Sequence, residues 1–199
     1  MKRISRSKAQ SRKMMLRGVL RWIIYAVALL LFYVWETNPL IRGWCPLLII
    51  PLATAVAMHE GDLAAGIFGA VCGLMLDMAS GVNVVGFSAL WLLALCPFIS
   101  LLSRFWIKMN WFSHFIMNLA VTVIMAFMDL LFLHLVWEGS QMAISFRESI
   151  FPAYFGAILF SVPVYLLVDR VVRSLRPKEE RRLEESAFSA EESEDKNRE

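Results

Sequence analysis

The sequence predicts an all-α membrane protein with six transmembrane helices. The chain of 199 residues is 58% hydrophobic and has a mean hydropathy of +0.59, whereas soluble domains are about 45–50% apolar. Its apolar residues gather in long blocks, as in proteins that cross the bilayer repeatedly. The length suits one domain, and the lipid bilayer is the first partner that the composition implies. The expected parts are a basic tail (1–21), the transmembrane domain (22–172) and a charged, largely disordered tail (173–199).

Six apolar runs define the expected helices. They cover residues 22–35, 44–58, 63–78, 84–102, 115–137 and 152–168. The first run follows a basic flank, as in a signal peptide, but no small-residue cleavage site follows it, so we expect an uncleaved helix. The second and third runs are short for a span of ~20 residues. They are either re-entrant segments or, as we prefer, helices packed inside the bundle.

The distribution of basic residues predicts the orientation in the membrane. Of the 20 Lys and Arg residues, 18 lie before the first run, between the fourth and fifth runs, or after the sixth. Because cytoplasmic segments are enriched in Lys and Arg, both termini are expected in the cytoplasm. Basic ends also occur in nucleic-acid-binding proteins, but no recognition motif accompanies them here, so no nucleic-acid partner is expected.

The sequence contains no recognisable catalytic, metal or cofactor motif. The three cysteines lie in apolar runs without CxxC spacing and are expected to be small buried hydrophobes: Cys45, Cys72 and Cys96. The three histidines lie in different connections or helix ends without an HExxH pattern: His59, His114 and His134. With no nucleophile–base pair visible either, we expect no enzymatic activity, no cofactor and no metal.

A stripe of small residues runs along the third apolar segment. Gly61, Ala65, Gly69, Gly73 and Asp77 recur at every fourth position and therefore share one face of a helix. Small residues at this spacing allow two membrane helices to approach closely. The acid at the end of the stripe is expected to face protein or water rather than lipid. Two glycines suited to a tight turn follow it: Gly81 and Gly86.

A second set of polar residues lies within the fifth run. Asn118, Thr122, Ala126 and Asp129 are spaced so that they share one helical face. Such a face is typical either of a proton path, ion path or ligand cavity, or of hydrogen bonds to neighbouring helices and outer-interface water. We favour the second interpretation, because transporters usually carry more intramembrane charge than two carboxylates.

One stretch resembles a known family. The residues Gly73-Leu74-Met75-Leu76-Asp77, then Gly81, then Gly86-Phe87-Ser88-Ala89-Leu90 are similar to the MreD family of rod shape-determining proteins. That family combines a small-residue helix ending in Gly-Leu-x-x-Asp, a glycine-bearing turn and a Gly-x-x-Ala-Leu helix start. The close similarity begins at Gly66 and ends at Leu90, and the rest of the chain agrees in hydropathy alone.

The resemblance implies a non-enzymatic scaffold of cell elongation and peptidoglycan synthesis in the bacterial plasma membrane. Its implied partners are MreC, the MreB cytoskeleton, RodA and class B penicillin-binding proteins. The implied fold is similar to the substrate-binding subunits of energy-coupling-factor vitamin transporters, which supply the alternative function, with other transporters also open. Such subunits usually carry Ala-x-x-x-Ala on the first helix. Here Leu30 follows Ala26 and Phe32 follows Ala28 at that spacing, so the docking face is missing.

Overall fold

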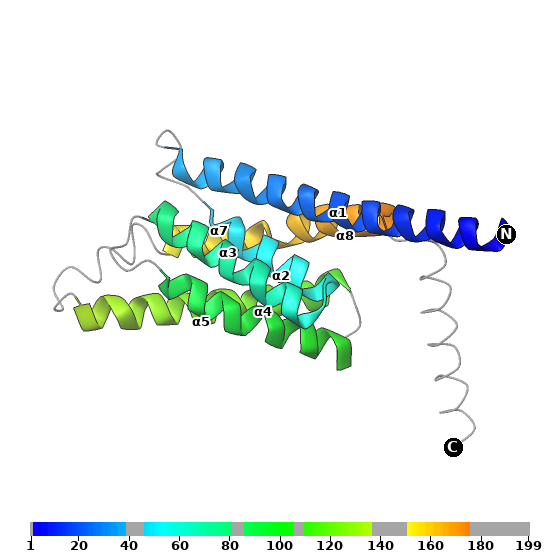
Figure 1. Cartoon of the computed structure of the whole chain (residues 1–199). Helices are drawn as coiled ribbons and strands as arrows, with labels where there is room; N and C mark the ends of the chain where they lie inside the picture. The colour runs from blue at the N-terminus through cyan, green and yellow to red at the C-terminus, as the bar shows by residue number, and fades with distance from the viewer. Residues whose placement is uncertain (1, 39–45, 81–85, 106–109, 137–150, 176–199) are drawn as a thin grey trace, which may run out of the picture. The chain divides into compact units, whose positions relative to one another are not determined.

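A computed structural model describes residues 2–38, 46–80, 86–105, 110–136 and 151–175, and every regular element in these ranges is an α-helix (Figure 1). The helices are α1 (Lys2–Thr37), α2 (Ile49–His59), α3 (Asp62–Ser80), α4 (Phe87–Phe105), α5 (Trp111–Val136), α7 (Phe151–Leu159) and α8 (Ser161–Leu175). The all-α expectation is thus confirmed for the described part of the chain. The basic tail is helical from Lys2 and continues into the first apolar run, while most of 173–199 lies outside the described residues.

The expectation of six membrane spans is confirmed only in its coarser form, a multi-pass membrane protein. Four helices are long and apolar enough to cross a bilayer: Leu16–Thr37 of α1, Asp62–Ala79 of α3, α4, and Trp111–Leu131 of α5. The sixth run is instead a pair of helices, α7 and α8, bent by 44°. Pro163 accounts for the break, because it has no N–H to donate to the carbonyl of Leu159.

The second run forms a short helix. α2 has 11 residues, which corresponds to a length of about 16 Å, against roughly 30 Å for the hydrocarbon core. Every residue of α2 is buried. Its backbone is held by its neighbours: the carboxylate of Glu36 accepts from the N–H of Ile49 at 3.1 Å, and the N–H of Leu47 donates to the carbonyl of Ala153 at 3.2 Å. A short helix at membrane depth is tolerated where protein satisfies its ends in this way.

The chain divides into two compact units, residues 25–169 and residues 1–24 with 170–199, and the fold described from here on is that of the first. Hydrogen bonds show that its segments alternate in direction. The contact of Glu36 with Ile49 joins the end of α1 to the start of α2. At the opposite end, the hydroxyl of Ser100, near the end of α4, lies 2.9 Å from the carbonyl of Glu60 and 2.7 Å from the carboxylate of Asp62.

The closest helix contact joins α3 and α4, which make the most extensive pair that the structure describes. Gly73 lies directly against the backbone of Ser88 and Ala89. A Cβ atom added at Gly73 would come within 3.0 Å of main-chain atoms of both residues. Main-chain atoms in a packed helix cannot swing aside as a side chain can, so only glycine fits at this position.

Two further glycines of α3 face α4 one and two turns earlier. A Cβ at Gly69 would lie 2.6 Å from the sulfur of Cys96 and 2.7 Å from the carbonyl oxygen of Leu92. A Cβ at Gly66 would lie 2.9 Å from Cγ of Pro97. Together the three glycines define the α3–α4 seam, which lies inside this bundle.

Gly73→Ala is expected to destabilise the protein, because one added methyl group must displace the α4 backbone. Overpacking of this kind costs about 1–3 kcal/mol. The control is Gly18→Ala in α1, where nothing lies within 4 Å of the added Cβ and where alanine is the better helix former. Thermal unfolding of the purified full chain in mild detergent measures both. Equal unfolding temperatures for the two variants would contradict the seam.

Candidate functional site

A cluster of buried polar side chains joins α2, α5 and α8. We call Thr54, His114, Asn118 and Ser161 the His114 cluster. The hydroxyl of Thr54 lies 3.2 Å from Nε2 of His114 and 3.1 Å from Oδ1 of Asn118, and the hydroxyl of Ser161 lies 3.2 Å from Nδ1 of His114. The amide of Asn118 also donates to the carbonyl of Ala157 at 3.3 Å. None of the four side chains is measurably exposed.

The donors and acceptors of the cluster determine one tautomer of the neutral imidazole. Oδ1 of Asn118 can only accept, so the hydroxyl of Thr54 donates to it. The oxygen of Thr54 is then left to accept from Nε2–H of His114, which makes Nδ1 the acceptor for the hydroxyl of Ser161. Each member therefore has a partner, as a polar group in a low-dielectric interior requires.

Tyr165 of α8 adds an aromatic layer to the cluster. Its ring stacks on His114 with centroids 4.7 Å apart and on His59 with centroids 5.7 Å apart. The prediction that the histidines lie apart is therefore wrong for these two, which sit on either side of one buried tyrosine. The reason is that α2 and α5 are adjacent, so the end of one and the start of the other meet α8.

Ser161 and His114 form a pairing of nucleophile and base types that the sequence analysis did not find. Both side chains are fully buried, and no described pocket includes either of them. A substrate therefore has no described route to the hydroxyl, and the pair as placed holds α5 to α8. Among the described residues, no group of three or more His, Cys, Asp and Glu side chains could hold a metal ion.

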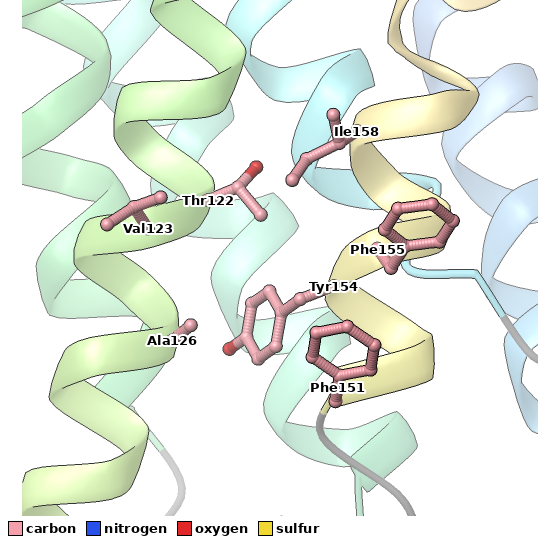
Figure 2. A pocket seen from close by; sticks show the side chains of 7 residues that line it. All are labelled: Thr122, Val123, Ala126, Phe151, Tyr154, Phe155 and Ile158. Atoms are coloured by element: carbon pink, nitrogen blue, oxygen red, sulfur yellow. The ribbon is translucent and has the colours of Figure 1, made fainter. Parts of the chain in front are cut away.

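The two remaining polar residues of the fifth run lie beside a pocket rather than in the cluster. Thr122 is 1% exposed, and its hydroxyl has no hydrogen-bond partner among the described residues. Asp129 is partly exposed and accepts a short hydrogen bond from the hydroxyl of Tyr154. Thr122 and Tyr154 line a half-open apolar pocket of about 120 Å³ between α5 and α7 (Figure 2).

Asp77 joins the two halves of the α3–α4 hairpin. It is 3% exposed, and its two carboxylate oxygens accept from the N–H groups of Gly86 at 2.8 Å and Ser88 at 3.1 Å. These N–H groups stand at the start of α4, where backbone donors lack partners in the helix and the helix dipole favours a negative charge. Gly86 has a φ of +105°, which side chains disfavour, while Gly81 lies outside the described residues.

The sequence analysis missed Thr54, His114, Ser161 and Tyr154 as members of polar contacts. One signal was present: His114 lies four residues before Asn118 and eight before Thr122, so it extends the same helical stripe. The partners on α2, α7 and α8 gave no such signal. Comparisons with protein-family models, with curated proteins and with solved structures found no match to the chain.

A matched pair of Thr→Val substitutions tests the hydrogen bonding. Thr54→Val removes a hydroxyl that bridges His114 and Asn118, and leaving buried polar groups unsatisfied costs about 1–3 kcal/mol. Thr122→Val removes an equally buried hydroxyl that has no described partner. We expect a lower unfolding temperature for the first variant and an unchanged or higher one for the second. The reverse order would show that the cluster does not stabilise the bundle.

Substitutions at Asp77 test its role as the cap of α4. Asp77→Ala removes both acceptors, and losing a helix cap costs about 0.5–2 kcal/mol. Asp77→Asn keeps one acceptor oxygen and places an NH₂ group against the second N–H. The asparagine variant should therefore unfold at a temperature between those of the wild type and the alanine variant. If asparagine is as harmful as alanine, the negative charge is essential.

Proposed function

We propose that the chain is a non-enzymatic membrane scaffold of bacterial cell elongation, similar to MreD, and that it binds an MreC-like membrane protein. Through that partner it would act with the MreB cytoskeleton, RodA and a class B penicillin-binding protein in peptidoglycan synthesis. The proposal rests on the resemblance of residues 66–90, to which the geometry of the α3–α4 hairpin adds support.

One observation carries the proposal. The two halves of the family-like motif, residues 73–77 and 86–90, contact each other at both of its ends. Gly73 packs on Ser88 and Ala89, and Asp77 caps the helix that begins beside Gly86. The residues of the motif are thus accounted for by the building of a hairpin, with none left over to bind a small molecule. A motif of this kind is expected in a scaffold.

The size of the described pocket favours the scaffold over a vitamin-binding subunit. Small-molecule sites usually enclose about 300–1,000 Å³ and include a few convergent polar groups. The pocket between α5 and α7 measures about 120 Å³, is half-open, and has apolar walls. Within the described residues, then, the feature that an energy-coupling-factor subunit needs most is small and polar groups are scarce in it.

The proposed placement is the bacterial plasma membrane with both termini in the cytoplasm. Six segments that alternate in direction return the chain to its starting side, if α2 and the bent α7–α8 pair each count as one crossing. This proposed arrangement is the one similar to the energy-coupling-factor subunits. The end with Glu60 and Ser100 is then cytoplasmic, in keeping with the basic residues of the sequence.

Loss of the gene is expected to turn rod-shaped host cells round, because elongation would lose a membrane component. Wild-type protein should restore the rods, and Gly73→Ala should restore them poorly at equal expression. Microscopy of cell width and length measures the effect. Persistent rods combined with reduced vitamin uptake would favour the alternative function.

A further inference from the structure

We infer that the groove between α5 and α7 is the docking site for a single transmembrane helix of the partner protein, and that this helix presents a hydrogen-bonding side chain to Thr122. The inference rests on the proposed function, which supplies an MreC-like partner. It concerns a surface that lies away from the family-like hairpin. Four independent features of the groove point to a helix as its occupant.

The floor of the groove is made of small side chains on α5. Thr122 and Ala126 lie four residues apart and both line the pocket (Figure 2). Small residues at this spacing let a second helix backbone approach closely in a membrane. On α3 the same spacing is occupied by α4, whereas on α5 it opens into an empty pocket of about 120 Å³.

The hydroxyl of Thr122 supplies the second feature. It is buried and lies in the pocket wall, without a hydrogen-bond partner among the described residues. A buried polar group in this state is destabilising until a partner arrives. A serine, threonine, asparagine or glutamine side chain on an incoming helix would provide one, as polar residues do across membrane helix interfaces.

Asp129 gives the groove a charge preference. It lies one turn beyond Ala126, and the hydroxyl of Tyr154 donates to one of its two carboxylate oxygens. The carboxyl group is partly exposed although it lies within an apolar segment. Carboxylates at this depth are usually paired with a donor. The partner helix is therefore expected to carry a donor, such as a lysine, arginine or tryptophan, near the end that meets Asp129.

The walls of the groove continue along both helices as two apolar rows. Each row repeats every fourth residue and is exposed: Val123, Phe127 and Leu131 on α5, and Phe151, Phe155 and Leu159 on α7. Rows at this spacing form the ridges between which a helix packs. Figure 2 shows the side chains of Phe151 and Phe155 along the α7 side of the pocket.

Two other occupants fit less well. A lipid acyl chain would fill the apolar space, but it has no group that can bond to the hydroxyl of Thr122 or to Asp129. A second copy docking groove to groove would bring two Asp129 carboxylates into the same apolar interface, where like charges repel strongly. A different helix with a donor satisfies both polar residues.

The test uses the full chain co-expressed with the MreC-like protein of the same genome and measures co-purification in mild detergent. Thr122→Val and Ala126→Leu are expected to weaken the association about three- to tenfold, by loss of a hydrogen bond and by filling of the groove. The matched control is Ala120→Leu, the same substitution at an exposed position of α5 that does not line the pocket. It should bind as the wild type does.

The folding of each variant is checked separately by its unfolding temperature. Thr122→Val should keep the wild-type stability or exceed it, so weaker binding by this variant cannot be ascribed to misfolding. If the wild type binds and both groove variants bind equally well, the groove is not the docking site, while the proposed function stands. If the wild type does not bind, the proposed partnership fails, and the inference with it.

A photo-crosslinking amino acid at position 155 identifies the occupant directly in membranes, with position 120 as the control. An adduct with the transmembrane helix of the MreC-like protein at position 155, stronger than at position 120, supports the inference. Adducts with a second copy of the chain, or with lipid alone, overturn it.

Discussion

The contact of the α3 and α4 backbones at Gly73 is the interaction on which the hairpin depends. Lipid tails are as apolar as leucine, so membrane helices associate mainly through van der Waals contact and hydrogen bonds. Glycine makes that contact closest, because no side chain lies between Gly73 and Ala89. Asp77, one turn further on, is brought to the start of α4 by the same approach and caps it. Close packing and capping therefore reinforce each other.

Satisfaction of polar groups in a dry interior is the second constraint, and it explains how α2 can be so short. A membrane-crossing helix normally places its unpaired ends in water, but α2 is buried throughout. Its first N–H groups instead meet Glu36, and Thr54 in its middle is joined to α5 through the His114 cluster. Gly156 of α7 leaves room for Pro46 at the entry to α2, where a Cβ would collide.

The sequence predicted the helical class and the apolar segments, because hydropathy and four-residue periodicity are local properties. It did not predict that the second run would be an 11-residue helix or that the sixth would bend, since both depend on proline positions and on which neighbours satisfy the freed backbone. For the polar face of α5 the outcome was mixed. Asn118, Thr122 and Asp129 share a stripe, but their different partners come from segments far along the chain.

Two seams built from small residues at four-residue spacing can be compared within this one bundle. On α3, the glycines are covered by α4, and the acid at the end of the stripe accepts two backbone N–H groups. On α5, Thr122 and Ala126 face an open pocket, and the acid beyond them receives a donor from Tyr154 while staying partly exposed. The first seam is complete within the chain. The second has the same geometry with its polar groups less fully matched, which is the difference expected between a helix pair that folds the protein and a surface that receives another helix.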